Sequence, residues 1–518
     1  MSGEPRIVLA TLNARYAHAS MGLRCLAANL GELRTRTRIL ELEITTPRGE
    51  IVEHLVHLAP TILGLGVYVW NVAETTAVVR DLRALSPNLL IVLGGPEVSY
   101  EPDDQPIVAL ANYVIAGEGE VAFAALARAL VAGERPVGKL IAARTPDLAA
   151  LALPYAEYTD DDVAHRVIYV EASRGCPYAC EFCLSALDVA VRSFPLDALL
   201  EALDGLIARG ARNFKFVDRT FNLSMPVATR ILEFFLDRHC PGLHVHFELI
   251  PDRLPPAILE LAARFPPDAL QFEIGIQTFT PNVNRGVSRR QNDDVAVRNL
   301  IALRDTTRVH VHADLLFGLP GETIDTFGAS FDRLLPLVPT AIQIGILKRL
   351  RGTPIVRHES ASGLVFSPSP PYEVLRTDAA SFDHVLAVKR LARAFEAFRN
   401  SGEHASAMAL LFAQGGSPWA QMRAFTEWLF VRIGRAWGLA LPRRCELLWD
   451  WLVAVRGVPP ADAARATIED FYLRAPRSER LVFLEPHVDT VELTALQRRN
   501  RSAAQATTNR RESASCSR

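Results

Sequence analysis

The stretch Glu171-Ala-Ser-Arg-Gly-Cys176-Pro-Tyr-Ala-Cys180-Glu-Phe-Cys183-Leu holds three of the seven cysteines of the chain. It follows a predicted apolar strand, residues 167–172, so it lies in a loop at the carboxyl end of that strand. Three thiolates at this spacing can surround one soft metal centre. A zinc site would need a fourth protein ligand, the nearest histidine in sequence is His165, and a ligand from elsewhere in the fold stays open. Three ligands would instead leave one iron of a [4Fe–4S] cluster free. Three buried structural thiols fit this polar, glycine-bearing loop less well.

The alternation of strands and helices continues beyond this loop. The predicted strands of this part are residues 167–172, 212–218, 243–249, 270–275, 308–316 and 341–347. Near-continuous apolar strands separated by helical patterns belong to parallel sheets that are covered on both faces. Six such repeats predict a parallel barrel, complete or partial, with its site at the carboxyl ends of the strands.

The region before the loop shows a similar alternation. Apolar runs at 7–12, 39–44, 61–67, 89–93 and 112–116 are separated by amphipathic segments. Five such strands predict an α/β domain with a doubly wound, flavodoxin-like parallel sheet. Ligands of these sheets bind beyond the carboxyl ends of the strands.

Three of those carboxyl ends are rich in glycine. They read Gly64-Leu-Gly66, Gly94-Gly95-Pro96-Glu97 and Gly117-Glu118-Gly119-Glu120. Glycine lets a backbone approach a ligand closely or adopt positive φ. One such motif alone is typical of an ordinary strand-to-helix turn, whereas three on one edge favour a large ligand lying across that edge.

We expect five parts in the chain. They are a flavodoxin-like domain at 1–140, a linker at 141–165, the barrel at 166–365, a helical C-terminal domain at 366–490 and a disordered tail at 491–518. Helical patterns at 372–399, 421–438 and 445–455 indicate the C-terminal domain. Its five tryptophans are expected in the core. The tail is arginine-rich and poor in apolar residues, which is typical of disorder.

The composition excludes several classes of protein. The chain has 518 residues, is 49% hydrophobic and 22% charged, and carries a formal charge of −2. This balance argues against a strongly basic nucleic-acid-binding chain. No apolar stretch is long enough for a transmembrane helix, and the first residues lack the features of a signal peptide, so we expect a cytoplasmic protein. Seven cysteines do not suggest a disulfide framework.

The cysteine loop resembles that of the radical S-adenosylmethionine (SAM) superfamily, which has Cys-x3-Cys-x2-Cys after the first strand of a partial (βα)6 barrel. The resemblance implies that Cys176, Cys180 and Cys183 bind a [4Fe–4S] cluster, and that Phe182 helps hold the adenine of SAM. It also implies that the free iron chelates SAM and that the reduced cluster cleaves SAM to methionine and a 5′-deoxyadenosyl radical. We expect the other cysteines to be dispensable for the cluster; they are Cys25, Cys240, Cys445 and Cys516.

Two later motifs look like the oxygen-independent coproporphyrinogen oxidase type of core. They are Glu273-Ile-Gly-Ile-Gln277 with the following Arg289, and Asp314-Leu-Leu-Phe-Gly318-Leu-Pro320-Gly-Glu322. The resemblance implies SAM contacts at Glu248, Gln277, Arg289 and Asp314. Each residue taken singly fits a strand-end hydrogen bond equally well. Asp218, which ends the second strand, receives no role because the Gly-Gly-Glu often found in the superfamily is absent.

With such a core behind it, the first domain looks like the cobalamin-binding domain of many radical SAM proteins. The resemblance implies cobalamin contacts at Gly66, Gly94, Gly95, Gly117 and Gly119. The Asp-x-His-x-x-Gly motif that supplies a cobalt ligand in many such domains is absent. His18 stands at the wrong spacing in the corresponding loop, so we do not expect it to bind cobalt. The domain order also looks like that of an uncharacterised subgroup of these proteins.

The leading functional hypothesis is a cobalamin-dependent radical SAM enzyme that transfers a methyl group to an unactivated carbon. The alternatives are a radical SAM oxidase or rearrangement enzyme without methyl transfer, and a non-catalytic iron–sulfur or corrinoid sensor. The cofactors would be a [4Fe–4S] cluster, SAM and cobalamin. The expected partner is a one-electron reductant such as flavodoxin or ferredoxin, with no membrane and no nucleic acid. The sequence does not identify the substrate or a catalytic side chain.

Overall fold

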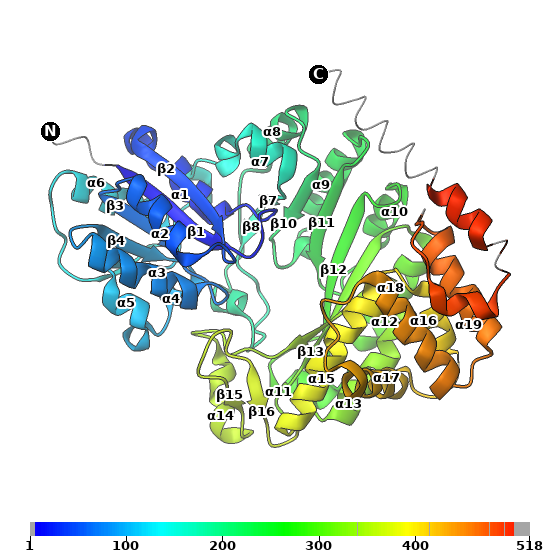
Figure 1. Cartoon of the computed structure of the whole chain (residues 1–518). Helices are drawn as coiled ribbons and strands as arrows, with labels where there is room; N and C mark the ends of the chain where they lie inside the picture. The colour runs from blue at the N-terminus through cyan, green and yellow to red at the C-terminus, as the bar shows by residue number, and fades with distance from the viewer. Residues whose placement is uncertain are drawn as a thin grey trace.

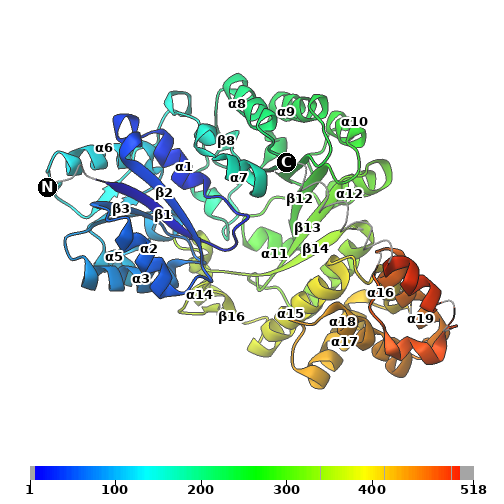
Figure 2. The same ribbon diagram turned by 45° about the horizontal axis from the view of Figure 1, so that its top comes forward.

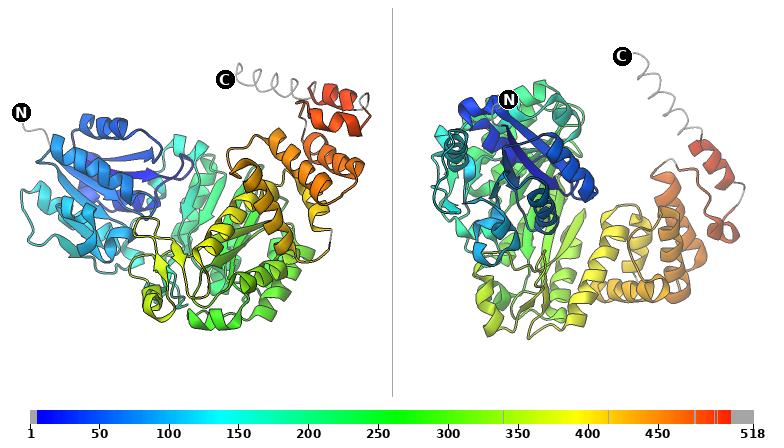
Figure 3. Two further views of the ribbon diagram at one scale, coloured as in Figure 1. Left: turned by 60° about the horizontal axis from the view of Figure 1, so that its bottom comes forward. Right: turned by 60° about the vertical axis from the view of Figure 1, so that its left-hand side comes forward.

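The computed structural model describes residues 6–501 except 339, 414, 476, 490 and 492. The chain forms two six-stranded parallel sheets flanked by helices, followed by a helical C-terminal region (Figure 1). The first sheet and the C-terminal helices lie on opposite sides of the second sheet (Figure 3). Among the described residues, no helix has the length and apolar character needed to cross a membrane.

The first sheet has the strand order β2-β1-β3-β4-β5-β6 and is doubly wound. Its strands are β1 Ile7–Asn13, β2 Thr37–Glu43, β3 Ile62–Gly66, β4 Leu90–Gly94, β5 Tyr113–Ala116 and β6 Leu140–Ala142. Helices α1 Met21–Ala28 and α6 Gly119–Val131 cover one face, and α2 Arg48–His57, α3 Val72–Leu85 and α5 Pro106–Leu110 cover the other. The predicted fold class is confirmed. The sequence does not predict β6, because this edge strand is largely exposed and has no long apolar run.

The second sheet has the order β14-β13-β12-β11-β10-β7. Its strands are β7 Ile168–Val170, β10 Asn213–Phe216, β11 His244–Leu249, β12 Leu270–Gln277, β13 His310–Phe317 and β14 Ala341–Ile346. Helices α8 Leu196–Ala208, α9 Met225–Asp237, α10 Pro256–Arg264, α12 Asp293–Thr306 and α13 Ile324–Leu334 surround it (Figure 2). The edge strands β7 and β14 do not pair within the described residues, so the barrel is partial.

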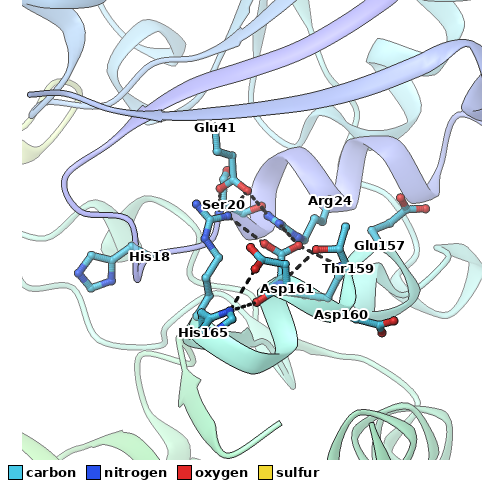
Figure 4. A network of polar contacts seen from close by, with 12 residues as sticks. His18, Ser20, Arg24, Glu41, Glu157, Thr159, Asp160, Asp161 and His165 are labelled. Carbon is cyan, nitrogen blue, oxygen red and sulfur yellow. Dashed lines mark hydrogen bonds and ion pairs between the residues drawn. The ribbon is translucent and has the colours of Figure 1, made fainter. Parts of the chain in front are cut away.

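A buried network of charged side chains fastens the segment between the two sheets (Figure 4). Arg24 of α1 lies 2.8 Å from Glu41 of β2 and 2.9 Å from Asp162 of α7, Asp160–His165. Arg166 lies 2.6 Å from the same Glu41. Each buried charge therefore has an opposite partner, which the low dielectric of the interior requires. The predicted linker thus packs against the first sheet and fixes where β7 begins.

The C-terminal region begins with a short hairpin of β15 Val365–Phe366 and β16 Val374–Arg376. The helix predicted from residue 372 begins only at Phe382, where the Ser381 hydroxyl accepts a hydrogen bond from the backbone N–H of His384. The region contains α15 Phe382–Phe395, α16 Ala405–Phe412, α17 Pro418–Ile433, α18 Leu441–Asp450 and α19 Pro460–Ile468. Of its tryptophans, Trp419 and Trp451 are buried as predicted, whereas Trp437 is exposed.

The helical region is joined to the barrel through the edge strand β14. The side-chain amide of Asn400 donates to the Ile342 carbonyl at 3.0 Å, and its oxygen accepts from the Ile342 N–H at 3.2 Å. Part of the open edge is thereby paired. At the end of the chain the sequence predicts disorder from residue 491, whereas residues 493–501 are helical. The rest of that prediction, residues 502–518, lies outside the described residues.

Candidate active site

The side chains that the resemblance assigns to the cluster and SAM line one cavity of about 170 Å³. The cavity lies where the loop after β7 meets the carboxyl ends of β11, β12 and β13. The structure brings together the following residues there: Cys176, Cys180, Phe182, Cys183, Glu248, Gln277, Arg289 and Asp314. Their roles remain a proposal, but their convergence is a property of the fold.

The three cysteines lie in a constrained loop. Cys176 and Cys180 are buried, and Cys183 is partly exposed. Gly175 is needed for this path, because its φ is +92° and a Cβ there would collide with the Ala190 carbonyl. Arg289 Nη1 lies 3.7 Å from Cys180 Sγ. Burial raises the pKa of the Cys180 thiol, and the Arg289 charge opposes that rise.

The donor set of this loop suits a cluster better than a single ion. Within residues 6–501 as described, no three His, Cys, Asp or Glu side chains are placed to share one metal ion. In a four-iron cluster each iron takes its own thiolate, so the three cysteines need only line a common cavity. Among the described residues, no histidine and no fourth cysteine lines that cavity. The residues present therefore fit a cluster with one iron free for another ligand.

Two buried polar atoms on residues that line this cavity have no hydrogen-bond partner among the described residues. They are Asp314 Oδ1 and Arg289 Nε. Burial, together with the nearby Glu273 and Glu248, raises the pKa of the Asp314 carboxyl well above its usual range. An unpaired buried polar group destabilises a protein, so both atoms indicate a polar ligand. SAM, which carries hydroxyl, ammonium and carboxylate groups, fits this pair.

The end of β12 explains how Gln277 reaches the cavity. The ladder between β12 and β13 shifts register between Gly275 and Gln277, and Gln277 has a φ of +68°. Such a bulge re-aims the side chain that follows it. A Cβ on Gly275 would lie 2.6 Å from Gln277 Nε2. Gly275 therefore leaves room for the amide of Gln277 to fold over the strand end.

Asp218, whose role the sequence leaves open, supports the cysteine loop. Its carboxylate accepts hydrogen bonds from the Ala172 N–H at 2.9 Å and the Ser173 hydroxyl at 2.6 Å. Burial raises the pKa of Asp218 to about 6, and these two hydrogen bonds oppose the rise. Asp218 thus fixes the backbone that leads to Cys176.

A second, larger cavity of about 540 Å³ lies at the carboxyl edge of the first sheet. The five glycines predicted to contact cobalamin all line it; they are Gly66, Gly94, Gly95, Gly117 and Gly119. Its opposite wall comes from the barrel domain and includes Leu184, Ser185, Asp188 and Arg219. The cavity therefore lies between the first sheet and the cysteine loop. Its size and its glycine edge fit a large, flat ligand such as cobalamin.

The glycines at this edge serve different purposes. Gly95 has a φ of +108°, and a Cβ there would lie 2.5 Å from the Val67 carbonyl oxygen. Its need for glycine is therefore explained by the protein backbone itself. At Gly94 a Cβ would meet only the Ile115 carbonyl oxygen, at 4.0 Å, and φ lies outside the positive range. Gly94 is thus the position where a side chain would enter the cavity without straining the backbone.

An ion-pair network around Arg174 joins the cysteine loop to the edge of the second cavity, and no sequence motif predicted it. Arg174, two positions before Cys176, lies 2.7 Å from Glu120 and 2.9 Å from Glu171, and it also donates to Glu118. Despite Arg174, burial raises the pKa of Glu171 to about 7. The glutamates of the third glycine motif therefore bind the arginine of the cysteine loop. The only signal in the sequence is that both charges stand at predicted strand ends.

The segment after β14 packs beside both cavities through two buried glutamates that line neither cavity. Glu97, beside the glycine pair at 94–95, accepts from Tyr372 Oη at 2.7 Å and pairs with Arg351 at 3.0 Å. Glu181, between the second and third cysteines of the loop, pairs with His358 at 2.8 Å and with Arg357. Local sequence patterns do not predict these pairings, because their partners are far apart in the chain.

His18 lies away from the second cavity. Its Nδ1 is 2.7 Å from Tyr169 Oη, and its backbone pairs with Val167 next to β7. Burial, with Arg15 and Lys215 nearby, lowers the pKa of His18. His18 does not line the cavity. Cys25 does line the cavity and is buried, and burial raises the pKa of its thiol.

Different family models match the parts of the chain that form the two sheets. Residues 170–334 match the radical SAM superfamily model, and residues 7–127 match the B12 binding domain model. Residues 361–438 match a protein of unknown function, DUF4080. The two characterised models imply a [4Fe–4S] cluster, SAM and cobalamin as the cofactors.

Curated relatives match parts of the chain. The cobalamin-dependent radical SAM methyltransferase TokK of Streptomyces tokunonensis is 24% identical over 56% of this chain and 47% of its own length. An uncharacterized methyltransferase of Pyrococcus horikoshii, PH0819, is 26% identical over 34% of this chain and 43% of its own length. The chain thus spans less than half the length of these relatives.

Solved structures match a larger share of the chain. The cobalamin-dependent SAM radical enzyme OxsB, solved with aqua-cobalamin and SAM, has a TM-score of 0.61 at 12% identity and covers 96% of this chain and 84% of its own. The radical SAM methyltransferase TsrM of Kitasatospora setae, solved with tryptophan and a SAM analogue, has a TM-score of 0.56 at 18% identity. The match covers 71% of this chain and 79% of the TsrM chain. At this identity the likeness shows the fold. By the family models, residues 170–334 form a radical SAM domain, which lies between a B12-binding domain and a domain of unknown function.

Proposed function

We propose that this protein is a cobalamin-dependent radical SAM enzyme that transfers a methyl group to an unactivated carbon. The observation that carries the proposal is that the cavity of the three cysteines and the cavity of the glycine edge share one lining residue, Arg219. A substrate at this junction could reach both cofactors. The alternatives without methyl transfer would not require the two cavities to meet.

Each group of residues has a distinct task in this proposal. Cys176, Cys180 and Cys183 hold the cluster, and Phe182 packs beside the adenine of SAM. The other proposed SAM contacts are Glu248, Gln277, Arg289 and Asp314, which the fold places on the same cavity. When bound, the reduced cluster and SAM supply a carbon-centred radical, and cobalamin supplies a carrier for a methyl group.

The protein also fixes the position of one cavity relative to the other. Arg174 joins the cysteine loop to Glu118 and Glu120 at the mouth of the second cavity. Because these groups are largely buried, the contact is not diluted by solvent. The loop thus cannot shift without breaking an ion-pair network. A fixed geometry of this kind protects a reactive radical from side reactions.

The proposed reaction consumes two molecules of SAM and two electrons for each methyl group transferred. One SAM accepts an electron, its bond from sulfur to the 5′ carbon breaks, and methionine leaves. The resulting radical takes a hydrogen atom from the substrate carbon and becomes 5′-deoxyadenosine. The substrate carbon radical would then bond to a methyl group that comes from a second SAM and that cobalamin would carry; this SAM becomes S-adenosylhomocysteine, and the transfer consumes a second electron. Both electrons come from a one-electron reductant such as reduced flavodoxin or ferredoxin, the proposed partner.

Two measurements test this function without a known substrate. Anaerobically reconstituted protein is reduced and given SAM labelled with a CD3 methyl group, and the products are measured by mass spectrometry. The proposal predicts 5′-deoxyadenosine, S-adenosylhomocysteine and label on the extracted corrinoid. Formation of 5′-deoxyadenosine without label on the corrinoid would favour a radical SAM oxidase or rearrangement enzyme. Formation of neither product would favour a sensor.

The cysteines provide the matched control. Replacement of Cys176, Cys180 and Cys183 with alanine should remove nearly all iron and all cleavage of SAM. Replacement of Cys240, which lines neither cavity, should leave both at the wild-type level. Equal iron in the triple variant and in the wild type would show that the cluster is bound elsewhere.

A further inference from the structure

We infer that Arg219 binds an anionic group, a carboxylate or a phosphate, of the substrate. The inference rests on the proposed function, because it assumes that the substrate lies between the two cofactors. It adds a substrate class and a specificity residue to that function. Neither the sequence motifs nor the family models assign a role to this arginine.

Arg219 lies at the junction of the two cavities. Among the described residues that line the two cavities, it is the one that belongs to both. A radical from one cavity and a methyl group from the other must act on the same carbon. The substrate must therefore lie at the junction, within reach of Arg219.

Arg219 also has N–H groups that make no hydrogen bond to the described residues. Its Nη1 lies 3.3 Å from both carboxylate oxygens of Glu248, which is a long contact for an ion pair. No described residue accepts a hydrogen bond from its Nε or Nη2, and the side chain is 54% exposed. A guanidinium offers five N–H donors in a planar fork that matches carboxylate and phosphate. Most of this fork is thus available to a ligand.

On the corrinoid side of the junction the surrounding charges do not oppose an anion, whereas Glu248 on the cluster side already contacts Arg219. The acidic side chains on the corrinoid side of the junction already have arginine partners. Asp188 pairs with Arg192 at 2.9 Å, and Glu118 pairs with Arg174 and Arg192. These carboxylates therefore do not compete for Arg219.

The backbone at this position is fixed in advance. Asp218, the preceding residue, is buried and accepts hydrogen bonds from Ala172 and Ser173. Arg219 therefore starts from a fixed point, although its guanidinium makes only the long contact to Glu248 among the described residues. A side chain anchored in this way loses less entropy when a ligand binds.

The experiment uses small anions as probes, because the substrate is unidentified. The full chain is reconstituted with its cluster and with cob(II)alamin, both of which can be paramagnetic. The relaxation of carbon-13 acetate and of phosphorus-31 phosphate is then measured by NMR, with acetamide as the neutral analogue of acetate. The variants are Arg219→Gln, Arg219→Lys and, as a matched control, Arg290→Gln, whose residue lines only the cluster cavity.

The inference predicts faster relaxation of one or both anions, and not of acetamide, in the wild type and in Arg290→Gln. In Arg219→Gln the apparent affinity should fall by about tenfold or more, as expected for a lost charge-assisted hydrogen bond. Arg219→Lys should keep part of the effect. The anion with the larger effect indicates whether the substrate group is a carboxylate or a phosphate.

Three results would overturn the inference: no anion effect in the wild type, an equal effect in Arg219→Gln, or loss of SAM or corrinoid from Arg219→Gln. The last result would mean that Arg219 holds a cofactor. The anion effect requires neither cleavage of SAM nor methyl transfer. Absence of methyl label with a retained anion effect would therefore count against the proposed function alone. If no corrinoid is retained, the reduced cluster still serves as the paramagnetic centre.

Discussion

The guanidinium of Arg174 lies 2.7 Å from the carboxylate of Glu120, and this contact joins the loop of the three cysteines to the glycine edge of the B12-binding domain. Arg174 also contacts Glu118 and Glu171. All four side chains are largely buried. Arg174 therefore links the cysteine loop directly to the edge of the second cavity.

Arg174→Gln should destabilise the protein strongly. It would leave Glu120 and Glu171 without their cation, while Glu118 would keep Arg192, and removal of one partner from a buried ion pair costs about 3–5 kcal/mol. Thermal unfolding measures the loss. Arg230→Gln, which breaks an exposed pair with Asp197, should change stability by no more than about 1 kcal/mol. Similar losses in the two variants would show that the Arg174 network has no special role.

Asp314→Asn should move stability and SAM affinity in opposite directions. Asp314 is buried, one of its oxygens lacks a partner, and its pKa is raised. Removing this ionisable group should stabilise the protein without SAM. Loss of a charge-assisted contact should weaken SAM binding by about 1.5–3 kcal/mol, or roughly 10- to 150-fold. Equilibrium dialysis with SAM and iron analysis test this, and the iron content should not change. Arg289→Ala should also weaken SAM binding, and unchanged affinity in both variants would remove these residues from the SAM site.

Gly94→Val should weaken corrinoid binding without disturbing the fold. Its side chain would enter the cavity, and overfilling a fitted site costs about 1–3 kcal/mol, or roughly 5- to 150-fold in affinity. Titration of the full chain with hydroxocobalamin, followed by the visible spectrum, measures the effect. Gly49→Val is a suitable control, because Gly49 lies in the same domain with nothing near its Cβ position. His18→Ala should also bind normally. Normal binding by Gly94→Val would place the corrinoid elsewhere.

The buried Glu322 should make stability depend on pH. Burial raises its pKa to about 8, and the nearby Thr278 hydroxyl only partly opposes this rise. Because the folded pKa exceeds the unfolded value, its contribution is fully present below about pH 4.5 and is lost as the pH rises through about 8. Glu322→Gln should remove this loss and stabilise the protein at pH 8 by up to a few kcal/mol, since one pKa unit equals about 1.4 kcal/mol. Thermal unfolding at pH 5 and pH 8 tests this, with Glu201→Gln, an exposed position, as the control. A gain that is equal at both pH values would contradict the assignment.

The sequence predicted the parts of the fold that depend on local patterns. Apolar runs located the strands of both sheets, and the spacing of Cys176, Cys180 and Cys183 located the loop. The strand β6 lacks such a run, and the helix expected from residue 372 starts at Phe382, after Pro370 and Pro371. Neither feature has a period that single-sequence reasoning can detect.

The contacts between domains were not predictable in the same way. Arg174 and Glu120 are 54 positions apart, and either charge alone is typical of an exposed strand end. Arg219 follows an aspartate whose role was open, and only the meeting of two cavities gives it importance. The residue types in the motifs predicted the cysteine loop and the glycine-rich strand ends separately. Their positions relative to each other became visible only in the structure.

The central claim is that the cluster and the corrinoid occupy adjoining cavities, and magnetic resonance tests it most directly. Full-length protein is prepared with cob(II)alamin, and the electron-spin relaxation of the cobalt is measured with the cluster oxidised and then reduced. The account predicts faster cobalt relaxation and a broadened signal when the cluster is reduced, and no such change in the variant with Cys176, Cys180 and Cys183 replaced by alanine. Cobalt relaxation that is the same in both states of the wild-type cluster would contradict it.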